Sequence, residues 1–124
     1  MFTDILIIKP NWCDAILNEG KIWEVRGHAT KKRETIGLAK SGTSKIYGEV
    51  DIVDCVPLTK DMYSTGVMNH HIPLTWEQLL KIYPTPYAWI LNEDSVKKFD
   101  EPIPFNYPRG AVIWVRYEDA KITE

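Results

Sequence analysis

Three charged residues stand close together near the start of the chain, in the stretch "NEGKIWEVRG". They are Lys21, Glu24 and Arg26. A lysine removed from water has a lowered pKa and becomes a usable base or nucleophile. A carboxylate accepts protons or amine hydrogens, and an arginine offers a planar fork of donors to phosphate or to a base carbonyl. The spacing indicates either a charged site or a solvated strand edge with a surface ion pair, which stabilises by well under about 1 kcal/mol.

The local elements decide which of these side chains can meet. In the strand expected here, alternation places Glu24 and Arg26 on one face and turns Trp23 toward a core. Lys21 follows Gly20, where the chain turns, so we expect it just outside the regular strand, at the mouth between a helix and the sheet. There it is either partly desolvated or reaches water along its aliphatic stem.

The stretch resembles the signature of the ASCH domain, a family in the PUA-like superfamily, which reads G-x-K-x-x-E-x-R. Lys21, Glu24 and Arg26 match the charged positions, and the glycine stands one position later, at Gly20. The resemblance extends to "LIIKPNWCDAIL", "IYGEVDIVDC", "YAWIL" and "GAVIWV". It implies an α+β fold, a small curved β-barrel of PUA-like type with about two peripheral helices and a cleft beside the first helix.

The same resemblance implies a function connected with RNA. Family members bind nucleic acids or modified bases, some small members remove the acetyl group from acetylcytidine with the motif lysine, and others are linked to RNA cleavage. The acetylcytidine-hydrolysing members carry a threonine where this chain has Glu24. Our first hypothesis is therefore that the protein is a binding module for RNA or for a modified nucleoside or nucleotide. In this module Lys21, Glu24 and Arg26 line the cleft.

Two alternatives to the binding module stay open. The chain is either a small hydrolase, acting on an acylated nucleoside or on RNA, or a protein-interaction domain whose cleft is vestigial. In the hydrolase, Lys21 acts as base or nucleophile and Glu24 as its proton partner.

Other residues are candidates for ligand contacts. Trp12 starts the first expected helix close to the motif lysine, and it either stacks on a base or packs in the core. In "KSGTSK", the hydroxyl of Ser41 and the backbone N–H groups around Gly42 either hold an anion or form a plain turn. The adjacent His70 and His71 have no acidic ligand pattern nearby, so we expect mobile loop histidines and no metal site.

Composition and charge limit the class of protein to which the chain can belong. The 124 residues suit one domain, 1–124, and 44% hydrophobic with 26% charged residues is ordinary for a soluble globular protein. The apolar runs are far shorter than the roughly 20 residues of a membrane span, and no secretory signal pattern opens the chain. We expect a cytoplasmic protein without a membrane partner or a cofactor, and Cys13 and Cys55 as reduced thiols.

The positive charge is unevenly distributed along the chain. The net charge is −2, but residues 21–45 hold seven basic residues against two acidic ones. Such a patch either attracts a phosphate backbone or is a lysine-rich solvated loop. We expect its loop 31–33 to flank the cleft.

Hydrophobic periodicity predicts the order strand, helix, strand, strand, strand, helix, strand, strand. The strands are "FTDILIIK", "KIWEVRG", "TIGLAK", "IYGEVDIVDCV", "YAWIL" and "AVIWVRY". Asn11 is expected to cap the first helix and Gly20 to close it, and Thr75 and Gln78 form a capping box for the second. Residues 57–74 and 92–110 are expected to be irregular. Short connections favour antiparallel or mixed pairing.

Overall fold

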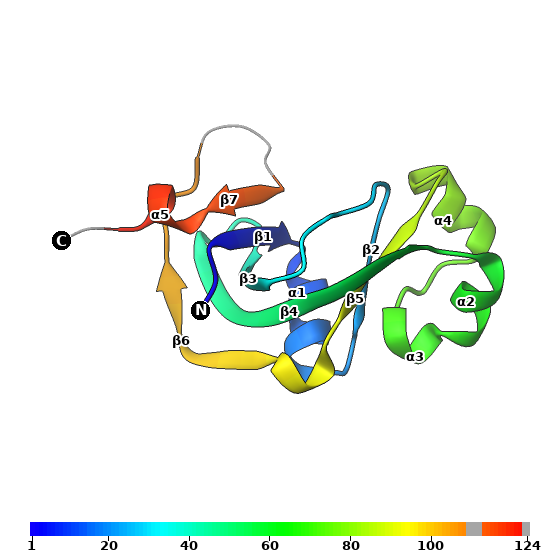
Figure 1. The fold of residues 1–124 in the computed structure, drawn as a ribbon, viewed down its shortest axis with the longest axis horizontal. Coiled ribbons are helices and arrows are strands. Elements are labelled where there is room, and N and C mark those ends of the chain that lie inside the picture. Colours follow the sequence, from blue (N-terminus) through cyan, green and yellow to red (C-terminus); the bar gives the residue numbers. More distant parts are fainter. Residues whose placement is uncertain (109–112, 123–124) are drawn as a thin grey trace.

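The computed structural model describes residues 1–108 and 113–122. A strand and a helix open the chain, three strands and then three short helices follow, and strands dominate the rest (Figure 1). In chain order the elements are β1 (Asp4–Ile8), α1 (Pro10–Asn18), β2 (Trp23–Arg26), β3 (Thr35–Lys40), β4 (Lys45–Pro57), α2 (Lys60–Thr65), α3 (Val67–His70), α4 (Trp76–Ile82), β5 (Tyr87–Leu91), the 3-10 turn η1 (Glu93–Ser95), β6 (Lys97–Pro104), β7 (Trp114–Arg116) and α5 (Tyr117–Ala120).

The seven strands of the described ranges form one mixed sheet in the order β2-β5-β4-β3-β1-β7, and β6 pairs with β4 beside this path. β1 and β3 run parallel, and the other pairs are antiparallel. β4 is 13 residues long, and it pairs with β3 through its first half and with β5 through its second half. The α+β class and the mixed pairing are therefore confirmed.

The curved sheet differs from the small β-barrel that the resemblance implies in one respect: it is not closed. In the part of the chain that the structure describes, the edge strands β2 and β7 do not pair with each other. The pairing of β4 with β5 shifts register between Ile52 and Asp54, and an irregularity of this kind bends a strand and increases its twist. β5 and β2 consequently run away from the β1–β7 edge (Figure 1).

Several predicted elements are confirmed. "TIGLAK" and "YAWIL" are β3 and β5, and Gly20 has a left-handed φ of 77° after α1. The Thr75 hydroxyl accepts a hydrogen bond from the Gln78 N–H while the Gln78 side chain accepts one from the Thr75 N–H, which is the expected capping box. Of the strand expected over "AVIWVRY", β7 covers Trp114–Arg116 and Tyr117 already begins α5, while the first two residues lie outside the described ranges.

Other expectations were wrong for identifiable physical reasons. α1 begins at Pro10 rather than after Asn11, since the fixed φ of proline suits the first helical position. Residues 57–74 contain the short helices α2 and α3, and the described part of the chain has five α-helices in place of about two. The loop expected over 92–110 contains η1 and β6; its prolines are tolerated because β6 lies outside the main strand path.

No helix in the described residues is long and apolar enough to cross a membrane.

The helices α2, α3 and α4 gather over the β2–β5 end of the sheet (Figure 1). A separate hydrophobic cluster forms between them, in which Val25 and Ala88 of the two strands pack with Leu58, Tyr63 and Leu79. The larger cluster runs from β1 and α1 through β3 and β4 to β5, and it includes Trp89, which is fully buried. Short helices cannot stand alone in water, so this packing is what holds α2–α4 in place.

The close approach of α2 and β2 yields a stability prediction. A Cβ atom on Gly66 would overlap Trp23 Cζ3 and lie 2.6 Å from the Met62 carbonyl oxygen. Gly66→Ala should therefore lower the free energy of unfolding by about 1–3 kcal/mol in urea denaturation. Ser64→Ala, at an exposed position of the same helix, is the control and should change it by less than about 0.5 kcal/mol. Equal stabilities of the two variants would contradict the packing described here.

Candidate functional site

A pocket of about 310 Å³ opens where β2, the start of α1 and the region from Ile72 to Tyr83 meet. It combines several charged groups with a mostly apolar wall. Its lining residues are Ile7, Ile8, Lys9, Trp12, Lys21, Glu24, Val25, Arg26, Ser41, Ile72, Leu74, Leu79, Ile82 and Tyr83. Five of the six residues selected from the sequence thus lie at one pocket, and Gly42, next to Ser41, is outside the described lining.

Lys21 lies at the turn before β2, as expected, but it is fully buried, with 1% exposure. Its Nζ donates hydrogen bonds to the carbonyl oxygens of Trp23 and His70, each at 2.7 Å. The left-handed Gly20 makes the turn that aims the side chain inward. Lys21 therefore does not reach water along its stem, and it joins the start of β2 to the end of α3.

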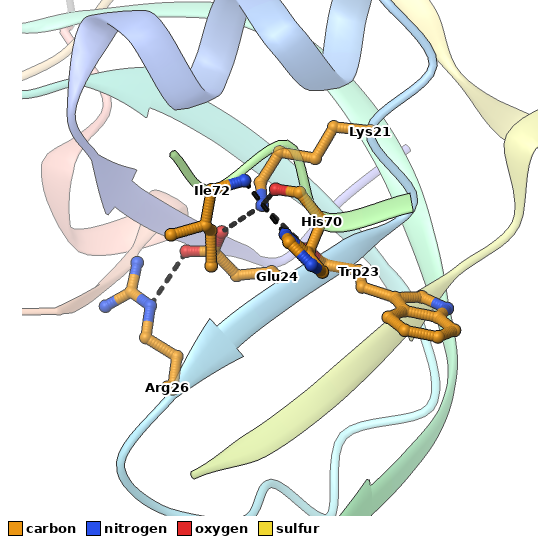
Figure 2. A network of polar contacts seen from close by, with 6 residues as sticks. All are labelled: Lys21, Trp23, Glu24, Arg26, His70 and Ile72. Carbon is orange, nitrogen blue, oxygen red and sulfur yellow. Dashed lines mark hydrogen bonds and ion pairs between the residues drawn. The ribbon is translucent and has the colours of Figure 1, made fainter. Parts of the chain in front are cut away.

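Glu24 and Arg26 share a face of β2 and pair with each other, which confirms the alternation argument (Figure 2). Arg26 Nε donates to Glu24 Oε2 at 2.8 Å, and Glu24 Oε1 lies 3.9 Å from Lys21 Nζ. The Glu24 side chain is only 5% exposed, so the pair is not the surface ion pair of a solvated strand edge. The guanidinium also lies over the ring of Trp89, 5.6 Å from its centre. Three charges consequently meet in a partly desolvated row.

Burial lowers the pKa of Lys21 to about 8, with Glu24 opposing the shift and Arg26 adding to it. Two hydrogens of Nζ are donated to carbonyl groups, and the ammonium lies 4.9 Å from the centre of the Trp12 ring. A neutral amine can keep both of these hydrogen bonds and still hold a lone pair, because only the third hydrogen is lost. The site therefore offers a cation near neutral pH and a base slightly above it.

Trp12 is half-buried at the pocket, so its ring both packs against the core cluster and reaches the cavity. The expectation of mobile loop histidines is wrong for His70, which ends α3 and is fully buried. His71 follows it with a left-handed φ of 60°. Periodicity could not predict this turn, because α3 has only four residues.

The basic loop 31–33 contributes less to the pocket than its charge suggests. Lys32 pairs with Asp4 and lies over the ring of Trp114, and Arg33 donates hydrogen bonds to the carbonyl oxygens of Thr30 and Lys32. These two cations hold the loop in its own conformation. The cation that lines the pocket mouth is instead Lys9, which sequence reasoning missed because nothing in its spacing links it to the motif.

The remaining reactive groups lie apart from this chemistry. Burial raises the pKa of Cys13 to about 12, so its thiol is a poor nucleophile, and Cys55 is also a free thiol. Within residues 1–108 and 113–122, no three His, Cys, Asp or Glu side chains come together in a way that could hold a metal ion.

Comparison with known proteins gives a match at the level of structure. No family model and no curated protein matches the sequence. Crystal structures of an ASCH protein from Zymomonas mobilis do match: the unmodified protein at 14% identity and a TM-score of 0.55, over 83% of this chain and 70% of that chain. Its tyrosine-to-phenylalanine variant matches at 17% and 0.62, over 82% and 74%, and its serine-to-alanine variant at 16% and 0.63, over 82% and 72%. The chain therefore has an ASCH-like fold.

The lowered pKa of Lys21 predicts a pH dependence of stability. The folded pKa is about 8 and the ordinary value 10.5, so between them the unfolded chain binds more protons. The free energy of unfolding should then rise with pH across this window, by up to about 3 kcal/mol from this residue. Urea denaturation of the protein and of Lys21→Met at about pH 7.5 and about pH 10 isolates the contribution, since other titrating groups are common to both.

Lys60→Met, which removes an exposed lysine of α2, is the matched control. It should follow the pH dependence of the unmodified protein, whereas Lys21→Met should lack the rise. Identical pH profiles for both variants would show that Lys21 is not desolvated.

Proposed function

We propose that this pocket binds a single nucleobase, presented by an RNA strand or by a free modified nucleoside. The observation that carries the proposal is the pairing of Glu24 and Arg26 at the pocket, which sets a hydrogen-bond acceptor directly beside hydrogen-bond donors.

The hydrogen-bonding capacity of this pair is only partly used within the protein. Arg26 contributes Nε to Glu24 Oε2, while its two terminal nitrogens and Glu24 Oε1 have no hydrogen-bond partner among the described residues. A carboxylate accepts from an exocyclic amine, and a guanidinium donates to ring nitrogens and carbonyl oxygens. The pair is complementary to a base edge that carries a donor next to an acceptor.

The size and walls of the pocket suit the same ligand class. Its volume of about 310 Å³ is at the lower end of small-molecule pockets, which hold roughly 300–1,000 Å³. The aromatic and aliphatic surface for the flat faces of a base comes from Trp12, Ile72, Leu79 and Tyr83. An unpaired base fits this combination, whereas the base edges of a duplex are already paired.

The pocket mouth favours a nucleotide chain as the source of the base. Lys9 and Ser41 line the pocket and are exposed, one as a cation and the other as a hydroxyl group. Phosphate oxygens of single-stranded RNA are natural partners for both groups. A free nucleoside would use the interior of the pocket and leave these two side chains in water.

Hydrolysis of a bound nucleoside or RNA is the second candidate, and the burial of Lys21 is the observation that favours it. With a pKa of about 8, a neutral amine is available close to neutral pH, 3.9 Å from the carboxylate of Glu24. Lys21 would act as base or nucleophile toward an amide or phosphodiester, and Glu24 would be its proton partner.

The binding proposal is tested by substitution of Arg26. Thermal-shift screening with nucleosides, nucleotides and short single-stranded RNAs should find a stabilising ligand, whose affinity is then measured by calorimetry. Arg26→Ala should weaken it roughly 5- to 150-fold, since a bidentate contact contributes about 1–3 kcal/mol of discrimination. Arg116→Ala, an exposed arginine of β7, should bind normally. A panel without any stabilising ligand, or equal affinities of the two variants, would refute the proposal.

Salt dependence separates the two sources of the base. Affinity for a short RNA should fall as salt rises, because bound phosphates release counterions, and Lys9→Ala should flatten that slope. Affinity for an uncharged nucleoside should be nearly independent of salt. If only the nucleoside binds, the free-nucleoside form of the proposal stands and the RNA form fails.

The hydrolase candidate predicts a pH profile. Turnover of an acylated nucleoside or RNA should rise with pH and level off above about 8, since the neutral form of Lys21 is the active one. Lys21→Ala should abolish turnover, with circular dichroism to verify the fold, and Glu24→Gln should reduce it. Lack of turnover across a broad panel of acylated nucleosides and RNAs leaves binding as the function.

A further inference from the structure

One wall of the pocket is formed by the segment that follows α3, with Ile72 and Leu74 facing the cavity. A pair of aromatic side chains holds this segment from behind. The ring of His70 stacks on the ring of Tyr63 at 4.2 Å with an interplanar angle of 2°. The Tyr63 hydroxyl donates to the Leu74 carbonyl oxygen at 2.7 Å, so the far end of the wall is fixed by the same pair.

Both ring nitrogens of His70 are engaged in this support, and Figure 2 shows the contact of one of them with Ile72. Nδ1 accepts the backbone N–H of Ile72 at 2.9 Å, so Nε2 carries the proton and donates to the Tyr63 carbonyl oxygen at 2.9 Å. The neutral ring therefore connects the wall to α2 through one acceptor and one donor. No aliphatic side chain can make both connections, which is a physical reason for a histidine at a fully buried position.

The backbone of the same residue holds the pocket lysine. The His70 carbonyl oxygen accepts from Lys21 Nζ at 2.7 Å, and the preceding carbonyl of Asn69 accepts from the Ile22 N–H at 3.0 Å. These are carbonyl groups at the end of α3, which have no partner within the helix. Lys21 thus caps α3, and the position of its nitrogen depends on where that carbonyl is held.

We propose that His70 is the positioning residue of the pocket: its ring fixes the backbone whose carbonyl oxygen holds the Lys21 nitrogen beside Glu24 and whose following residues form the pocket wall. This rests on the proposed function only in that it assigns the residue to the same pocket. The contacts belong to the protein without ligand, so they can be tested separately from binding.

Two variants separate positioning from simple core packing. His70→Phe keeps a ring that can stack on Tyr63 but removes both hydrogen bonds of the imidazole. His70→Asn loses the stacked ring but keeps a side-chain acceptor near the place of Nδ1, within reach of the Ile72 N–H. A purely structural histidine would tolerate the aromatic replacement better, whereas a positioning histidine would be better replaced by the amide.

The measurement is the pH titration of the Lys21 side chain by NMR in isotopically labelled protein, without added ligand. His70→Phe should release the wall and admit water to Nζ, which should raise the pKa of Lys21 by about one unit or more toward its ordinary value. His70→Asn should shift it by clearly less. Ser64→Ala, on the exposed side of α2, should leave the titration unchanged.

The inference is overturned if Lys21 titrates in folded His70→Phe as it does in the unmodified protein, even when that variant is less stable. If His70→Phe does not fold, Tyr63→Phe decides, because it keeps the ring and removes only the hydroxyl, which donates to the carbonyl oxygens of Leu74 and, at 3.5 Å, Ile72. It should shift the Lys21 titration in the same direction. An unshifted titration there also refutes the inference. Absence of any nucleobase ligand would refute the proposed function and leave this result standing.

Discussion

The buried ammonium group of Lys21 is the constraint on which the rest of this site depends. Removing a cation from water costs several kcal/mol unless hydrogen bonds and an opposite charge compensate for it. Here the compensation comes from the Trp23 and His70 carbonyl groups and from the carboxylate of Glu24. The segments that supply them are far apart in the chain, so one side chain fixes the start of β2 against the end of α3. The shape of the pocket follows from that junction.

The same compensation shapes the chemistry of the site. Glu24 balances a buried cation on one side and is oriented by Arg26 on the other, so its carboxylate is held in one place before a ligand arrives. A preorganised acceptor and donor pair gains affinity because less freedom is lost on binding. Binding and hydrolysis would therefore use the same arrangement, and they differ in whether Lys21 keeps its third hydrogen.

Sequence reasoning succeeded where local rules decide the structure. Strand alternation placed Glu24 and Arg26 together, and the lysine out of phase with that pattern pointed to the turn. It failed where distant contacts decide. The helices α2 and α3 are too short to be stable without the core beneath them, the open sheet depends on a register shift within β4, and β6 has an irregular pattern with prolines. The burial of His70 could not be predicted, because its ring meets Tyr63 and Ile72 only where the short helices α2 and α3 have formed.

The pairing of β2 with β5 has a consequence for the order of assembly. The sheet partner of β2 follows it by about sixty residues, and the Lys21 contact to His70 spans 49 residues of chain. Closing such long loops is entropically costly, so non-local contacts of this kind tend to form late and slow the folding reaction. As a chain leaves the ribosome, Lys21 emerges well before its acceptor and stays hydrated until α3 and β5 have followed. The site is thus complete only after these later segments have been made.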